Sequence, residues 1–190
     1  MLGFKPDVNE QVEVNLQTPL HIICRKPSTN LTLAALLLLK HGADPLARDD
    51  QGNTPFHYLV QLEFYDGWTD LVRRFLKIDG SLTVTNNNGQ TVLHLATSGR
   101  NPEVLEILLQ HGAEIDAKDE AGNTPLHIAC RGLEHTHSSH TTIMVETLVR
   151  YGANINAKND SQHTPIQLAN MRGDQTLIQL LLKNGAKSQI

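Results

Sequence analysis

Apolar and polar positions along the chain recur in blocks of about 35 residues. Each block contains a short apolar segment, a second apolar segment and then a polar stretch with a glycine. In the second segment of the third block, Val104, Leu105, Leu108 and Leu109 are spaced so that they fall on one face of a helix. A repeat of this length predicts a stack of similar helical units in place of a single globular fold.

Two sequence markers that stay in phase define these units. The first is a tetrapeptide related to Thr-Pro-Leu-His, which begins at Thr18, Thr54, Thr91, Thr124 and Thr164. The second is a glycine after the second apolar segment, found at Gly42, Gly80, Gly112, Gly152 and Gly185. The distance from glycine to the next threonine stays at 11 or 12 residues, whereas the distance from threonine to glycine varies from 21 to 28. All the length variation therefore lies inside the units.

Local residue chemistry predicts how a unit folds. Thr91 can cap the first turn of a short helix, and where proline follows the threonine, as at Pro125, it occupies the first helical position. The second helix is expected to end at Gly112, where a positive φ angle costs little. Residues 119–123 then form a polar turn that leads to the next threonine. Each unit is thus predicted to be two antiparallel helices with a projecting loop.

Repeated in phase, these features resemble the ankyrin repeat over about residues 13–187. The resemblance implies an all-α ankyrin-repeat solenoid of about five helix-turn-helix units, with finger loops projecting beside a concave face that binds other proteins. We expect one domain over residues 1–190, with units at about 13–47, 48–84, 85–117, 118–157 and 158–190. The last helix has an apolar side that would suit a polar cap or a further repeat, so a longer parent protein is compatible with the sequence.

Three units depart from the pattern. Unit one has Leu16 where the finger glycine would stand, so we expect its finger to be absent or irregular. Unit two carries one extra residue at the end of its second helix, before Gly80. Unit five has Gln162 at the glycine position and Gln167 in place of the histidine.

One histidine occupies the same position in each of four successive units, at His21, His57, His94 and His127. The resemblance implies that this side chain bridges neighbouring repeats by hydrogen bonds, as a buried polar ring requires. We therefore assign these residues a structural and not a catalytic role.

Composition narrows the classes of partner. The formal net charge is −4, and the chain has no Lys/Arg cluster longer than Arg73-Arg74, which argues against nucleic acid. No apolar stretch approaches the 18 or more residues of a membrane span, and the amino terminus lacks the pattern of a secretory signal. Cys24 and Cys130 are three units apart, or roughly 30 Å at one helix layer per unit, so we expect free buried thiols. These features favour a monomer in the cytoplasm or nucleus, or in the host cytoplasm for a pathogen effector.

Catalytic and cofactor motifs are weak. The sequence has no glycine-rich phosphate loop after a strand and no recurring carboxylate pair, so we expect neither an enzyme nor a bound cofactor. His135, His137 and His140 are histidines, a residue type that ligates zinc or copper. Because nothing in the sequence fixes their geometry, a solvated loop is the favoured interpretation.

The resemblance also implies which residues face a partner. The exposed positions are the residue before the finger aspartate, the finger tip, the residue before the threonine and the end of the first helix. In this chain they are Arg48, Asp50, Gln51, Asn53, Gln61, Asn87, Asn88, Gln90, Ser98, Lys118, Glu120, Asn123, Arg131, Asp160, Ser161, His163, Met171 and Arg172. A possible second surface is the insertion of unit two, with Phe64, Tyr65 and Trp68, although these rings could equally cover neighbouring helices.

The favoured function is a protein-protein interaction module. Residues 48–57 and 85–94 also resemble the inhibitor of NF-kappa-B group, which would imply sequestration of a transcription factor. The alternatives are an effector of an intracellular pathogen, suggested by the irregular insertions, and a structural spacer in a larger enzyme or membrane protein.

Overall fold

The computed structural model describes residues 7–26, 29–62, 68–99, 101–132 and 139–187. These residues form ten α-helices in five pairs and no strand. The pairs are α1 and α2 (Pro19–Cys24, Thr29–Lys40), α3 and α4 (Pro55–Leu59, Trp68–Phe75), α5 and α6 (Val92–Ser98, Pro102–Gln110), α7 and α8 (Pro125–Arg131, Ser139–Arg150), and α9 and α10 (Pro165–Arg172, Gln175–Lys183). The predicted all-α solenoid of five helix pairs is confirmed.

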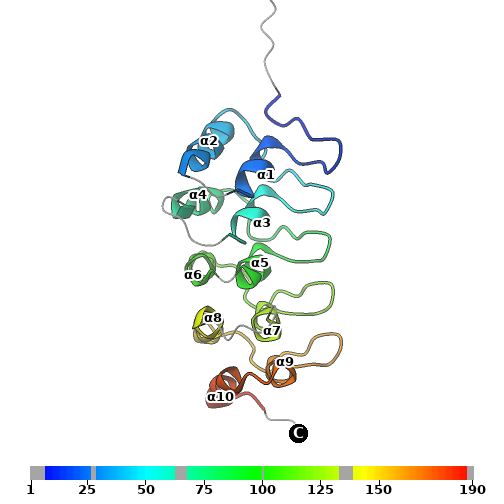
Figure 1. Cartoon of the computed structure of the whole chain (residues 1–190), viewed down its shortest axis with the longest axis vertical. Coiled ribbons are helices and arrows are strands. Elements are labelled where there is room, and N and C mark those ends of the chain that lie inside the picture. Colours follow the sequence, from blue (N-terminus) through cyan, green and yellow to red (C-terminus); the bar gives the residue numbers. More distant parts are fainter. Residues whose placement is uncertain (1–6, 27–28, 63–67, 100, 133–138, 188–190) are drawn as a thin grey trace, which may run out of the picture.

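The helices form two layers (Figure 1). The odd-numbered helices, called inner helices below, stack in one layer, and the even-numbered outer helices stack beside them. The loops that precede the inner helices project from the inner layer as five fingers, one above the other (Figure 1). This arrangement leaves the fingers and the ends of the inner helices on one continuous side of the stack.

The core lies between the two layers and runs through all five pairs. Leu93, Leu105, Leu126 and Leu148 are almost fully buried there. In unit two, the rings of Phe56 and Phe75 stack with their centroids 5.1 Å apart and so join an inner to an outer helix. Every unit buries such side chains against the units next to it, so stability rests on nearest-neighbour contacts.

Both cysteines are free and buried in this core, as predicted. Burial raises the pKa of the Cys130 thiol to about 12 and also raises that of Cys24. These thiols therefore stay protonated and act as small apolar side chains.

The four buried histidines join successive units. The imidazole Nε2 of His21 lies 3.0 Å from the carbonyl oxygen of Asn53, and that of His94 lies 3.0 Å from the carbonyl oxygen of Asn123. His57 and His127 make the same bond to Gln90 and His163 at 3.2 and 3.0 Å. The predicted bridge between neighbouring repeats is confirmed at all four junctions.

The opposite ring nitrogen holds the start of the same helix. Nδ1 of His94 accepts the backbone N–H of Thr91 at 3.2 Å and lies 3.0 Å from the threonine hydroxyl. Since a carbonyl oxygen can only accept, Nε2 must carry the proton, and Nδ1 of the neutral ring is left as the acceptor. In unit five, Gln167 replaces the histidine, and its Oε1 accepts the N–H of Thr164 at 2.8 Å. The glutamine thus keeps the cap.

Replacing His94 or His127 by alanine should lower the free energy of unfolding by about 1–3 kcal/mol, because buried N–H and C=O groups lose their partner. Chemical denaturation of each variant measures this change. His41→Ala, at an exposed position at the end of α2, is the control and should leave the midpoint unchanged. Equal midpoints for all three variants and the parent would contradict the bridging role.

Acid should weaken the stack, because burial lowers the pKa of all four imidazoles and brings that of His57 to about 4. The unfolded chain, with histidine pKa values near 6.5, binds more protons than the folded chain below that pH. The stability that the neutral imidazoles contribute is therefore fully present above about pH 6.5 and is lost as the pH falls towards 4. From pH 7 to pH 5 the loss should be about 2 kcal/mol for His57 alone.

Urea unfolding at the two pH values measures the loss. The matched variant is His57→Gln, which copies the cap that Gln167 makes in unit five and removes one titrating group. It should show a smaller pH dependence than the parent. An unfolding free energy that is equal at pH 7 and pH 5 would contradict a neutral, buried imidazole at the junctions.

Candidate protein-binding face

Backbone hydrogen bonds join the tips of the five fingers. The tip N–H of Asp50 donates to the carbonyl of Asn15 at 3.1 Å, and that of Glu120 donates to the carbonyl of Asn88 at 2.9 Å. The other two junctions have the same bond, from Asn87 to Gln51 at 2.9 Å and from Asp160 to Ala121 at 3.1 Å. The fingers are therefore joined into one edge along the stack.

An Asp or Asn at the base of each regular finger fixes its turn. The Oδ1 atom of Asp49 accepts the N–H groups of Gln51 and Asn53 at 3.0 and 2.8 Å. A glycine lies three residues after this Asp or Asn. At Gly122 the φ angle is +71°, and a Cβ atom added there would lie 2.8 Å from the backbone nitrogen of Asp160. Glycine is needed there both for its backbone angle and for the close approach of the next finger.

The irregular positions take the conformation of the missing glycine. Leu16 has φ +55° and Gln162 has φ +61°. In finger one the N–H of Val12 donates to the carbonyl of Gln17, five residues on, whereas Asp49 reaches Asn53, four residues on. Finger one is thus present and one residue longer, so the expected irregularity is correct and the expected absence is wrong.

Most predicted contact residues lie at the surface of the fingers and inner-helix ends. The exposed ones are Arg48, Asp50, Gln51, Gln61, Asn87, Asn88, Lys118, Glu120, Arg131, Asp160, Ser161 and Met171. Gln90, Ser98, His163 and Arg172 are partly buried. We refer to these sixteen residues below as the candidate face.

Asn53 and Asn123 were predicted to be exposed, and this is wrong. Both are buried, because the side-chain amide of Asn86 donates to Oδ1 of Asn53 at 3.0 Å, and that of Asn159 donates to Oδ1 of Asn123 at 2.8 Å. These amides join one finger base to the next. They serve the stack and leave no side-chain surface for a partner.

Some residues of the candidate face also touch the next unit. A guanidinium N–H of Arg48 donates to the carbonyl of Thr85 at 2.8 Å, and the ammonium of Lys118 donates to the carbonyl of Lys158 at 3.2 Å. Both side chains are exposed, so their remaining N–H groups still meet solvent. They are therefore held in place without being withdrawn from the surface.

A polar cluster between units one and two was not predicted from the sequence. The guanidinium of Arg25 lies 5.1 Å from the ring centroid of Tyr58 and donates to Oε1 of Gln17 at 3.1 Å. The Tyr58 hydroxyl donates to Oδ2 of Asp49 at 2.5 Å. Arg25 lies seven residues after the threonine of its unit, as Arg131 does in unit four. Extending the position-by-position comparison of contact residues to unit one would therefore have identified Arg25.

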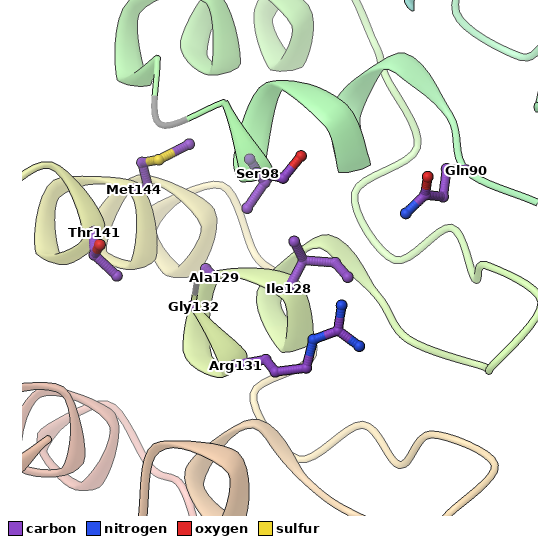
Figure 2. Close-up of a pocket in the computed structure, with 9 residues that line it drawn as sticks. Gln90, Ser98, Ile128, Ala129, Arg131, Gly132, Thr141 and Met144 are labelled. Atoms are coloured by element: carbon purple, nitrogen blue, oxygen red, sulfur yellow. The ribbon is translucent and has the colours of Figure 1, made fainter. Parts of the chain in front are cut away.

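A small pocket opens where three helices meet (Figure 2). It lies between α5, α7 and α8, and it brings together three residues of the candidate face, Gln90, Ser98 and Arg131. Its volume is about 60 Å³. Small-molecule and cofactor sites typically hold about 300–1,000 Å³, so this pocket suits a single protruding side chain.

Several predictions about chemistry fall on parts that are not described. Phe64, Tyr65, His135 and His137 lie outside the described residues, and for Trp68 only its place at the start of α4 is described. Within the described part of the chain, no group of three or more His, Cys, Asp or Glu side chains could hold a metal ion. No helix in the same part is long and apolar enough to cross a membrane.

The stacked helix pairs, their histidine bridges and the finger edge define a helical-repeat protein. A family model of three ankyrin repeats matches residues 64–138, and a single-repeat model matches residues 15–50 and 121–160. The chain belongs to the ankyrin-repeat family, as its sequence markers predicted.

Several curated proteins of this kind are similar to the chain. NF-kappa-B inhibitor alpha of Sus scrofa is 33% identical over 113 residues, which are 51% of this chain and 36% of that protein. The B-cell lymphoma 3 protein homolog of Mus musculus is 32% identical over 173 residues, which are 90% of this chain and 36% of that protein. NF-kappa-B inhibitor cactus of Drosophila melanogaster is 28% identical over 123 residues, which are 50% of this chain and 25% of that protein. The matches thus span about a third or less of these relatives.

Finger geometry makes two opposite substitutions informative. Gln162→Gly should stabilise the protein by about 1 kcal/mol. Position 162 adopts a left-handed backbone conformation, and glycine avoids the steric cost that a Cβ atom has there. Gly122→Ala should destabilise it by more than that, because it adds the same penalty and a clash with Asp160. Thermal unfolding measures both. A lower melting temperature for Gln162→Gly would show that the glutamine side chain holds the finger.

Proposed function

We propose that this chain is a protein-protein interaction module that binds a transcription factor of the NF-kappa-B class on its candidate face. The observation that carries the proposal is the similarity to NF-kappa-B inhibitor alpha and to NF-kappa-B inhibitor cactus, over 51% and 50% of this chain. Those names describe the relatives, and the proposal transfers the class of partner from them to this chain.

The layout of the candidate face supports such binding. Its side chains lie on a backbone that is held between units by the histidine bridges and the finger edge. A surface fixed in advance loses little conformational entropy when a partner docks. Arg131 and Met171 extend from the ends of neighbouring inner helices, and arginine and methionine are enriched in the cores of interfaces.

The same features favour binding over catalysis. The buried thiols stay protonated, and the buried imidazoles already use both ring nitrogens for structural bonds. A protein held in this way would act as a monomeric binder in the compartment of its partner, the cytoplasm or the nucleus. We propose no catalytic activity and no binding to nucleic acid or to membranes.

A binding measurement with purified NF-kappa-B tests the proposal. We expect the immobilised chain to bind it, and Arg131→Ala/Arg172→Ala to weaken binding by about 2 kcal/mol or more, the scale of an interface hot spot. Tyr65→Ala/Trp68→Ala, which changes the possible second surface, should bind like the parent. Circular dichroism must show that both double variants are folded.

The two parts of the proposal fail in different ways. No binding to NF-kappa-B at micromolar concentration would exclude this class of partner. Binding that only the aromatic pair weakens would keep the partner and move the contact away from the candidate face.

A further inference from the structure

Three arginines stand at the ends of inner helices, and their surroundings differ. Arg25 is held by Tyr58 and Gln17, and Arg172 donates to the carbonyl of Cys130 at 3.4 Å. Arg131 is exposed and makes no hydrogen bond or ion pair with any residue that the structure describes. The five N–H donors of its guanidinium are therefore all available within this part of the chain.

A second free donor faces the same pocket. The side-chain oxygen of Gln90 accepts a hydrogen bond from the amide of Asn86 at 3.2 Å, which fixes how the Gln90 amide is turned. Its NH₂ group then points towards the pocket, on the side to which the Arg131 guanidinium extends (Figure 2). The amide and the guanidinium are thus two donors that line one pocket, and neither donates a hydrogen bond to a residue that the structure describes.

The rest of the pocket is mostly apolar, with hydroxyl groups from Thr97, Ser98 and Thr141. Ile128, Ala129 and Met144 form buried apolar walls. The hydroxyl of Ser98 donates to the carbonyl of Leu95 at 3.0 Å, so its proton is in use. None of the described residues that line the pocket is acidic. The pocket therefore combines a positive charge and solvent-accessible donors with apolar walls.

We propose that this pocket is a subsite for a carboxylate, supplied by an Asp or Glu side chain of the bound partner. A carboxylate accepts hydrogen bonds only, and it can take two from one guanidinium and a third from the Gln90 amide. The apolar walls formed by Ile128, Ala129 and Met144 would contact the methylene groups of the same side chain. The inference rests on the proposed function, since it names the chemistry by which a partner is recognised.

The finger tips set the direction in which such a partner lies. Asp50, Glu120 and Asp160 place exposed carboxylates at the tips, away from the basic ends of the inner helices. The fingers thus carry both signs of charge, because Arg48 and Lys118 are exposed there as well, whereas no acidic residue lines the pocket beside Arg131 in the described structure. A partner carboxylate is therefore favoured at Arg131 over the finger tips.

A phage-displayed library of random dodecapeptides serves as the probe, so the test does not depend on knowing the natural partner. Selection on the parent protein should enrich peptides that share an Asp or Glu at one position. These peptides should bind Arg131→Gln about tenfold more weakly, the loss expected for a charge-assisted hydrogen bond. Arg131→Lys keeps the charge without the planar fork and should fall between the two.

Arg73→Gln is the matched control, because it removes the same charge from an exposed arginine on outer helix α4. Its affinity for the selected peptides should equal that of the parent. Recovery of no peptides, peptides without a shared acidic position, or equal loss in Arg131→Gln and Arg73→Gln would each overturn the subsite. Circular dichroism confirms that the variants are folded.

The outcomes separate this inference from the proposed function. If NF-kappa-B binds the parent and Arg131→Gln equally and no acidic peptide is selected, the function stands and the subsite is wrong. If acidic peptides bind through Arg131 while NF-kappa-B does not bind, the subsite stands and the class of partner is wrong.

Discussion

A neutral imidazole that accepts on one nitrogen and donates on the other is the interaction on which the stack depends. In four units, Nδ1 closes the first turn of an inner helix while Nε2–H reaches a backbone carbonyl of the next unit. Helix formation and unit stacking therefore share one side chain. The carbonyl it reaches belongs to the residue just before the next threonine, so the bridge also sets the height at which the next inner helix begins.

The finger edge depends on this spacing. Because each inner helix starts at a set height, the finger before it comes close enough for one tip N–H to meet one tip carbonyl. The buried amides of Asn53 and Asn86, and of Asn123 and Asn159, fill the space between finger bases with matched donors and acceptors. What remains at the surface is a set of polar side chains on a rigid support, and these are free to vary because no core depends on them.

The sequence predicted the parts of the fold that are encoded within a single unit. Threonine, proline, histidine and glycine act over a few residues, so their spacing was enough to predict helix pairs, caps and turns. The burial of Asn53 was not predictable in this way, because its hydrogen-bond partner lies 33 residues later. For the same reason the Arg25 and Tyr58 cluster was missed, since it joins two units. Leu16 and Gln162 show a further limit, because the units around them impose a backbone angle that their own side chains disfavour.

The hydrogen bonds between units form two parallel rows, one at the finger tips and one at the bases of the inner helices. Two rows at different distances from the outer helices resist bending in a way that a single row does not. To bend the stack towards or away from the fingers, the spacing in one row must change relative to the other. Small differences in spacing between the rows, added over successive junctions, therefore set the curvature of the molecule. A partner that changes the spacing between two fingers would therefore change the bend at that junction, while the remaining junctions keep their own spacing because each unit contacts only its neighbours.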